Sequence, residues 1–170
     1  VFFPSAIGNM LAVNIALRVG AKGIGTSTVT AFASATHSIG EAFRNIKHGY
    51  SDVIIAGGAE APITEIGISG FASLTALTKA TDPEKASIPF EKERSGVVMG
   101  EGAGVFILES LDHALERGAT ILGEVVGYGA NCDAYHMTSP TPDGSGAAKA
   151  MVLAMEEAGI SPEKIGYINA

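Results

Sequence analysis

The stretch V-T-A-F-A-S-A-T-H-S-I-G-E-A-F, residues 29–43, decides the fold. It passes from the β-branched run T-S-T-V-T through small residues into a pattern that predicts a helix. Backbone N–H groups point outward at the start of a helix, so this is a favourable place for a nucleophile or an anion. The residue at the bend is nevertheless Phe32, a hydrocarbon side chain without a reactive atom. The sequence therefore surrounds an unreactive residue with the features of a reactive site.

The segments on either side of this bend predict a βαβ unit. Residues 23–30 are predicted to form a short strand rich in Thr and Val, and the predicted helix from 33 to 48 has one apolar face and ends at Gly49. The apolar run D-V-I-I-A-G-G follows at 52–58 and has the length of a buried strand. Strand, helix and strand in this order predict a parallel pairing of the two strands.

The rest of the chain continues the alternation of helices and strands. Helical spacing that stops at a glycine predicts helices at Asn9–Val19, 111–118 and Ser145–Gly159. Apolar runs interrupted by glycine predict two strands within 96–110 and further strands at 121–130 and 167–170. The chain is therefore expected to be an α/β protein.

Composition excludes several function classes. The 170 residues are 46% hydrophobic and only 17% charged, which excludes a disordered chain and indicates apolar surface covered from outside the chain. The net charge of −7, without a basic cluster, argues against a nucleic-acid partner. No apolar run reaches the length of a membrane span, so no membrane association is expected. The single cysteine, Cys132, fits a reducing, cytoplasmic location.

Three further groups of residues invite a chemical interpretation, and each has a structural alternative. Ser34 and His37 share a helix face and could act as a nucleophile and its base. A hydroxyl in the first helical turn, however, is more often a capping group. The glycines of G-E-G-A-G, residues 100–104, lead into an apolar strand pattern rather than a helix, which argues against a phosphate-binding loop. Cys132, Asp133 and His136 match no zinc spacing, so we expect no metal site.

Four motifs together resemble one family, the β-ketoacyl-[acyl-carrier-protein] synthases, and within it the type II elongating class of fatty-acid synthesis. They are the opening stretch, D-V-I-I-A-G-G-A-E-A, P-F-E-K-E-R-S-G-V-V-M-G-E-G-A-G and D-A-Y-H-M-T-S-P-T-P-D-G. The resemblance implies an α/β thiolase-like fold with α-β-α-β-α layers, of which this chain would be a part. Residues 1–118 would end the first thiolase-like half, and residues 119–170 would begin the second.

The resemblance also implies roles for individual residues. Phe32 occupies the position of the family's nucleophilic cysteine, whose thiolate a helix start would stabilise. Phe71 matches a residue near the acyl pocket, and Thr138 and Ser139 match the region lining the pantetheine channel. The family's two catalytic histidines would follow Ala170.

The implied activity is decarboxylative Claisen condensation of an acyl thioester with malonyl-acyl-carrier protein. With Phe32 at the nucleophile position, we expect this chain to be catalytically inactive as written. One alternative is a non-condensing partner subunit similar to the chain-length factors, and another is a variant engineered to block acylation. The implied partners are an acyl carrier protein and a second copy of the chain. No cofactor is expected, because phosphopantetheine arrives on the carrier protein.

Overall fold

The computed structural model describes Pro4 and residues 7–170. The chain divides into two compact units, one formed by residues 1–57 with 105–170 and the other by residues 58–104. The predicted division of the chain at Gly118 is a different kind of boundary and stays a prediction.

The helices of the first unit begin and end close to where the sequence predicts them. They are α2 (Met10–Val19), α3 (Ser34–Lys47), α5 (Leu111–Glu116) and α6 (Ser145–Ala158), with 3₁₀ turns η1 (Ala31–Ala33) and η3 (Pro162–Lys164). Glycine follows each α-helix within two residues with a left-handed backbone, at Gly20, Gly49, Gly118 and Gly159. A left-handed residue lets the chain turn away while the last helical carbonyls are still hydrogen-bonded, and glycine adopts it without steric cost.

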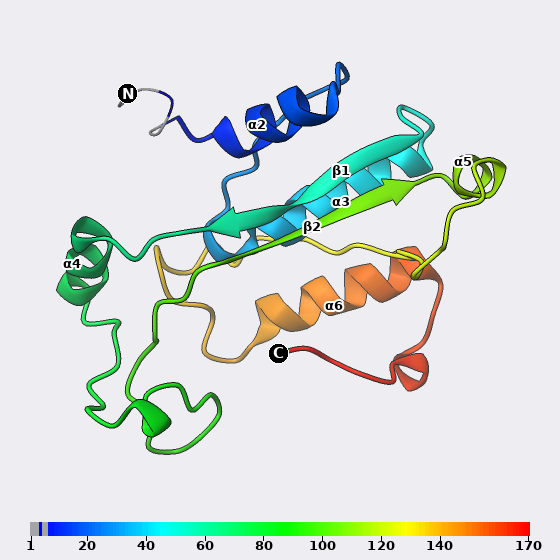
Figure 1. Ribbon diagram of the computed structural model, residues 1–170. Helices are drawn as coiled ribbons and strands as arrows, with labels where there is room; N and C mark the ends of the chain where they lie inside the picture. The colour runs from blue at the N-terminus through cyan, green and yellow to red at the C-terminus, as the bar shows by residue number, and fades with distance from the viewer. Residues whose placement is uncertain (1–3, 5–6) are drawn as a thin grey trace. The chain divides into compact units, whose positions relative to one another are not determined.

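The sheet differs from the predicted parallel βαβ unit. It has two strands, β1 (Val53–Glu60) and β2 (Gly102–Glu109), whose arrows run in opposite directions in Figure 1. The N–H of Ser110, after the end of β2, donates to the carbonyl of Asp52, before the start of β1, at 2.9 Å. The pairing of β1 with β2 is therefore antiparallel. The predicted parallel pairing of residues 52–58 with residues 23–30 was wrong, because 23–30 forms no ladder within the described chain.

Three segments predicted as strands are not strands in the structure. Residues 23–30, 121–130 and 167–170 have no ladder partner within the described chain. A strand is defined by hydrogen bonds to a neighbour, so an apolar extended segment without one carries the pattern but not the ladder. The two strands predicted within 96–110 become β2 and an isolated parallel bridge between Leu77 and Val97.

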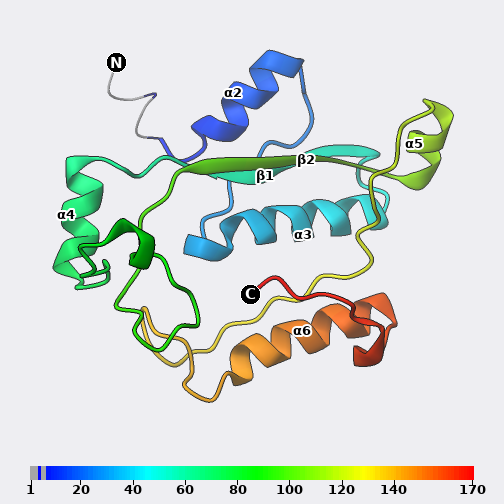
Figure 2. The ribbon, with the colours of Figure 1, turned by 60° about the horizontal axis from the view of Figure 1, so that its bottom comes forward.

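The first unit is nevertheless layered. Figure 2 shows α2 on one side of the paired strands and α3 on the other, followed by the extended segment 121–130 and then α6. Hydrogen bonds tie this segment to α3 and α6 through Tyr128. The order of helix, sheet, helix, extended segment and helix corresponds to the α-β-α-β-α layering that the resemblance implies.

The second unit contains α4 (Glu65–Ser73), η2 (Pro83–Lys85) and connecting loops. Thr64 caps α4, because its hydroxyl accepts a hydrogen bond from the N–H of Gly67 at 3.0 Å. Thr78 N–H donates to the carbonyl of Val97, and Val97 N–H donates to the carbonyl of Ala76, both at 2.9 Å. These two bonds join the segment after α4 to the segment before β2.

Few side chains of the described chain are buried. Its buried apolar residues are Ala42, Ala56, Ala114 and Tyr128. The accessible surface is 13184 Å², whereas a compact monomer of 17.3 kDa exposes about 7,800 Å². This excess agrees with the expectation that much apolar surface is covered from outside these residues.

Candidate active site

The predicted site lies on the short turn that leads into α3. Residues Ala31–Ala33 form η1, and α3 begins directly afterwards at Ser34. Ala31 has a φ of +51°, a left-handed conformation that costs a residue with a Cβ about 1–2 kcal/mol. The next residue, Phe32, is 94% exposed. The turn thus presents the side chain at position 32 at the start of a helix, where free N–H groups gather.

Ser34 holds this turn together. Its hydroxyl accepts a hydrogen bond from the N–H of Thr30 at 2.8 Å and donates to the carbonyl of Ala31 at 2.7 Å. The N–H of Ala33 also donates to the carbonyl of Thr30, at 3.2 Å. The sequence predicted that Ser34 caps an N–H of α3, and this was wrong. Ser34 instead bridges Thr30 and Ala31, at the left-handed turn.

His37 extends the network by one helical turn. Its Nδ1 is hydrogen-bonded to the Thr30 hydroxyl at 2.7 Å and lies 3.2 Å from the carbonyl oxygen of Ala33. With a hydrogen on Nδ1, the ring donates to the turn; without one, Nδ1 accepts the hydroxyl hydrogen of Thr30. Either tautomer ties the ring to the turn. Ser34 and His37 share a helix face, as predicted, but both serve the backbone around position 32.

Tyr128 covers the face of α3 behind the turn. Its ring meets the ring of His37 edge to face, with centroids 6.2 Å apart and an interplanar angle of 81°. The guanidinium carbon of Arg44 lies 4.8 Å from the centre of the same ring. Burial raises the pKa of the Tyr128 hydroxyl, and the Glu41 carboxylate raises it further, against the opposing charge of Arg44.

Glu157 of α6 joins the same group of residues. Its carboxylate accepts hydrogen bonds from Arg44 at 3.3 Å, from the N–H of Tyr128 at 3.0 Å and from Lys47 at 3.4 Å. Burial alone would raise the pKa of Glu157, but these hydrogen bonds outweigh it and the pKa is lowered. The ionised carboxylate therefore links α3, the segment around Tyr128 and α6.

The other predicted site residues are distributed over both units. Phe71 is half-buried on α4 in the second unit. Thr138 and Ser139 are exposed in the first unit, and their N–H groups donate to Nδ1 of His136 at 3.1 and 3.2 Å. No hydrogen bond or ion pair connects them with the turn at position 32 in the described part of the chain.

The glycine-rich stretch 100–104 and the residues around Cys132 lie apart from this turn in the sequence and have their own local geometry. The glycine-rich stretch 100–104 leads into β2, so no helix start is available there for a phosphate. His136 uses Nδ1 to accept backbone hydrogen bonds, and Asp133 accepts one from the N–H of Thr141 at 2.9 Å. Among the described residues, no group of three His, Cys, Asp or Glu side chains is placed to hold a metal ion. The described residues also contain no helix long and apolar enough to cross a membrane.

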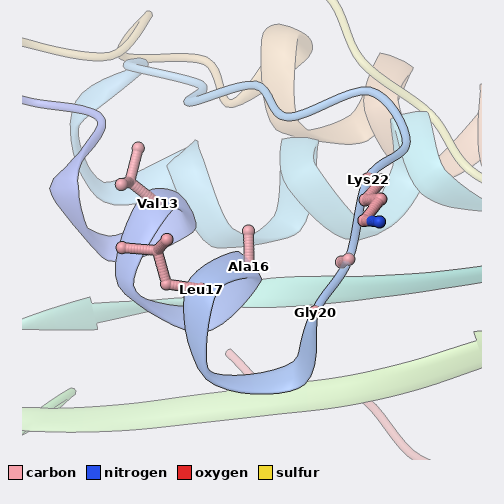
Figure 3. Close-up of a pocket in the computed structure, with 6 residues that line it drawn as sticks. Val13, Ala16, Leu17, Gly20 and Lys22 are labelled. Atoms are coloured by element: carbon pink, nitrogen blue, oxygen red, sulfur yellow. The ribbon is translucent and has the colours of Figure 1, made fainter.

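One surface hollow lies away from this site. It is lined by apolar residues of α2 and by the turn after it, including Val13, Ala16 and Leu17 (Figure 3). Lys22 supplies the charged group at its edge. An apolar hollow made by one helix and its following turn offers no nucleophile or acid–base pair, so it does not compete with the turn at position 32 as a reactive site.

Sequence reasoning missed the residues behind the turn, which are Tyr128, Arg44 and Glu157. The signal that could have indicated Tyr128 is its setting in G-Y-G, because flanking glycines allow close approach of neighbouring backbone. Ideal Cβ atoms on Gly127 and Gly129 would overlap the backbone of α6 at Ala154 and Ala150. The glycines thus let this segment lie directly on α6 while Tyr128 packs on α3.

Comparison with known protein families gives this geometry a context. The model of the β-ketoacyl synthase N-terminal domain matches residues 1–114, and that of the C-terminal domain matches residues 122–170. The chain belongs to the β-ketoacyl synthase family. Together the two matches cover most of the chain, so the resemblance identified from the four motifs is confirmed.

Individual β-ketoacyl synthases are similar over nearly all of the chain. It is 51% identical over 168 residues to 3-oxoacyl-[acyl-carrier-protein] synthase 2 of Synechocystis, covering 98% of this chain and 40% of that protein. It is 48% identical over 169 residues to the enzyme of the same name from Staphylococcus aureus, covering 99% of this chain and 42% of the relative. The chain therefore spans about two fifths of the length of these curated relatives.

Solved structures confirm the thiolase-like ketosynthase fold. A type II polyketide ketosynthase solved in complex with its acyl-carrier protein matches with a TM-score of 0.94 and 36% identity, covering 98% of this chain and 41% of that one. A β-ketoacyl synthase from Burkholderia phymatum matches with a TM-score of 0.90 and 41% identity, covering 95% and 39%. The ishigamide ketosynthase/chain length factor matches with a TM-score of 0.82 and 38% identity, covering 94% and 38%.

Proposed function

We propose that this chain is part of a 3-oxoacyl-[acyl-carrier-protein] synthase of fatty-acid elongation in which the nucleophile position is occupied by Phe32. The observation that carries the proposal is the turn before α3, which presents position 32 almost fully exposed at a helix start in a chain of this family. The relatives named above, 48–51% identical, support elongation of fatty acids as the pathway.

The proposed reaction needs a nucleophile at position 32. A thiolate there would attack the carbonyl carbon of an acyl thioester, forming a new C–S bond while the bond to the carrier's thiol breaks. Malonyl thioester would then lose CO₂, and the electron pair left on its α-carbon would attack the bound acyl group and release the thiolate. The N–H of residue 32 is suited to stabilise the oxyanion of both steps.

Phe32 cannot perform either step, because a phenyl ring has no lone pair that attacks a thioester. The chain as written is therefore proposed to be catalytically inactive, while the turn, Ser34 and His37 keep the arrangement that a thiol would need. The only prosthetic group in this scheme is the phosphopantetheine of the carrier protein, which the region of Thr138 and Ser139 is proposed to receive. Phe71 is proposed to lie near the acyl pocket.

We also propose a homodimer as the working state, in the cytoplasm. Residues 25–30, before Phe32, match by resemblance the strand that pairs across the family's homodimer, and we propose that they lie at a two-fold interface. Val29 in this segment and the adjacent Ile24 are more than four fifths exposed in the described chain. Exposed apolar side chains gathered in one short segment are typical of a surface that a partner covers. Light scattering of the whole polypeptide at micromolar concentration tests this point, and a monomer contradicts it.

A second candidate is a non-condensing partner subunit of the chain-length-factor type. It is favoured by the absence of a nucleophile at position 32 and by the likeness to the ishigamide ketosynthase/chain length factor structure. A third origin of Phe32 is a substitution introduced to block acylation. Sequencing codon 32 in the source gene separates this third case from the other two.

The test restores a thiol in the whole polypeptide that carries this sequence. Phe32→Cys, made in a Cys132→Ser background to remove the exposed native thiol, is incubated with acyl-carrier protein loaded with an acyl group. Intact-mass measurement is expected to show one acyl group on the variant and none on the unmodified chain. An adduct on the unmodified chain contradicts inactivity. No adduct on the variant contradicts the condensing lineage and favours the partner subunit.

A matched thiol elsewhere controls for exposure alone. Phe90 is 79% exposed and lies in a loop of the second unit rather than at a helix start. In the same Cys132→Ser background, Phe90→Cys is expected to react with iodoacetamide as free cysteine does, with a pKa of about 8.5. Phe32→Cys is expected to react faster at neutral pH, because helix N–H groups stabilise the thiolate.

A further inference from the structure

The side chain of Tyr128 is the most buried aromatic group of the described chain and serves none of the steps above. It is 6% exposed, and its hydroxyl is buried without a hydrogen-bond partner among the described residues. A buried hydroxyl without a partner costs free energy, so the fold accepts a penalty to keep this ring in place. The ring must therefore contribute through its packing.

Tyr128 packs along one continuous face of α3. His37, Gly40, Glu41 and Arg44 are spaced i, i+3, i+4 and i+7, so they lie on the same side of the helix. The ring meets His37 edge to face, lies directly on Gly40, and is covered by Arg44. Arg44 also donates to the carbonyl of Tyr128 at 3.3 Å. Contacts with His37, Gly40 and Arg44 thus fix the position of Tyr128 on the helix.

The contact with His37 leads directly to the turn. The same imidazole that meets Tyr128 is hydrogen-bonded through Nδ1 to the Thr30 hydroxyl at 2.7 Å. Thr30 is in turn bonded to Ser34 and Ala33, which enclose the left-handed Ala31 and Phe32. A rotation of the imidazole would break its hydrogen bond to Thr30. The ring of Tyr128 packs against the imidazole and therefore opposes such a rotation.

We propose that Tyr128 is a positioning residue for the turn Thr30–Ser34, acting through His37. The ring holds the imidazole in the rotamer that binds Thr30, and Thr30 with Ser34 holds the strained backbone at Ala31. Residue 128 lies in the part of the chain matched by the C-terminal family model, so one half of the family fold supports the turn of the other. The inference rests on the proposed function only in treating position 32 as the reacting position.

The first test measures the turn itself and needs no activity. Amide hydrogen exchange is followed at Thr30 and Ala33 in the whole polypeptide, for Tyr128→Leu and Tyr128→Phe. Tyr128→Leu removes the edge-to-face contact and is expected to speed exchange at both amides about tenfold, the effect of losing one aromatic pair. Tyr128→Phe keeps the ring and removes only the unpartnered hydroxyl, so the exchange rates are expected to stay unchanged.

Two control variants separate positioning from general loss of stability. Ala114→Gly loosens the buried side of α5 and destabilises the first unit without touching the turn. Tyr167→Leu removes a tyrosine that is 78% exposed. Neither is expected to speed exchange at Thr30 relative to the amides of α3. If Tyr128→Leu behaves like Ala114→Gly at these two amides, the proposal is overturned.

A second variant covers the case that Tyr128→Leu does not fold. Thr30→Val removes the hydroxyl that receives the support from His37 and changes an exposed side chain of nearly the same shape. It is expected to speed exchange at Ala33 by a similar factor. Unchanged exchange in Thr30→Val means that the contacts through His37 do not hold the turn, and the proposal fails.

The reactivity of a thiol at position 32 gives a separate readout. In the background Phe32→Cys with Cys132→Ser, Tyr128→Leu is expected to move the pH profile of iodoacetamide labelling toward that of free cysteine, and Tyr128→Phe is expected to leave it in place. An unactivated thiol in the background alone contradicts the proposed function, while the exchange rates still decide the role of Tyr128. If the thiol is activated and Tyr128→Leu leaves its labelling profile unchanged, only the positioning role of Tyr128 is contradicted.

Discussion

The ring of Tyr128 lies directly on Gly40 of α3, at a place where any Cβ on residue 40 would overlap three of its carbon atoms. Gly40 is buried in the middle of a helix, where glycine is ordinarily unfavourable by about 1 kcal/mol relative to alanine. Glycine at position 40 weakens the helix, but only glycine leaves room for the ring of Tyr128.

Gly40→Ala is therefore expected to destabilise the protein although alanine favours helices. The methyl group must displace the Tyr128 ring, and overpacking of this kind costs about 1–3 kcal/mol. The free energy of unfolding from denaturant titration measures the effect. Gly70→Ala in α4 is the matched control, since nothing lies within 4 Å of the added Cβ there, and it is expected to stabilise the protein. If Gly40→Ala and Gly70→Ala change the free energy of unfolding in the same direction, the close contact between Gly40 and Tyr128 is contradicted.

Gly129→Ala is expected to detach the segment 121–130 from α6. A Cβ at residue 129 would overlap the carbonyl oxygen of Ala150, a backbone atom that cannot move aside as a flexible side chain does. Gly123→Ala in the same segment meets open space and is expected to change the unfolding free energy by less than about 0.5 kcal/mol. Faster exchange at the N–H of Tyr128 in Gly129→Ala alone is the diagnostic result, because this N–H is bonded to Glu157.

The helices could be predicted from the sequence because the signals that end them are local. Gly20, Gly49, Gly118 and Gly159 each adopt the left-handed conformation that follows a helix, and each was identified as a helix end from its place in the pattern. The strands predicted at 23–30 and 121–130 are not strands in the described chain. Their apolar patterns indicate burial, but a ladder depends on a partner strand that the segment itself does not specify.

The turn at position 32 could be found because its residues are contiguous and their family motif is distinctive. The group behind the turn could not, since Gly40 and Tyr128 are 88 positions apart and only the fold brings them together. A tyrosine between two glycines and an arginine on a helix are each unremarkable in sequence. Glu157 is likewise an ordinary carboxylate of α6 until its three donors are placed around it.

The carboxylate of Glu109 makes the described fold sensitive to acid. Hydrogen bonds from Arg117 and then from His113 lower the pKa of Glu109 from 4.5 to about 2. Because the folded chain holds this proton more weakly than the unfolded chain, the stabilisation is complete above pH 4.5 and is lost as the pH falls toward 2. Glu109→Gln is expected to be less stable than the parent at pH 7, with the difference disappearing near pH 2.

Denaturant titrations of both proteins between pH 7 and pH 2 measure this convergence. Glu116→Gln on the exposed side of α5 is the control and is expected to follow the parent throughout. A difference between Glu109→Gln and the parent that stays constant with pH contradicts the role of the ion pairs and indicates a packing effect instead. High salt is expected to reduce the difference at neutral pH, since the Arg117 side chain is half exposed.

Because Ala31 is strained, replacing it by glycine is expected to affect stability differently from the same replacement inside a helix. Ala31 has a φ of +51°, where a Cβ costs about 1–2 kcal/mol, and glycine would remove that cost while losing about 0.5–1 kcal/mol of backbone entropy. Ala31→Gly is therefore expected to leave the unfolding free energy unchanged or raise it by up to about 1.5 kcal/mol. Ala35→Gly, four residues later within α3, carries the entropy cost without relief and is expected to destabilise by about 1 kcal/mol. Denaturant titration of the two variants measures the difference between them. Equal destabilisation by both would mean that Ala31 is not held in the left-handed region, and the supports from Ser34 and Thr30 would then have no strain to balance.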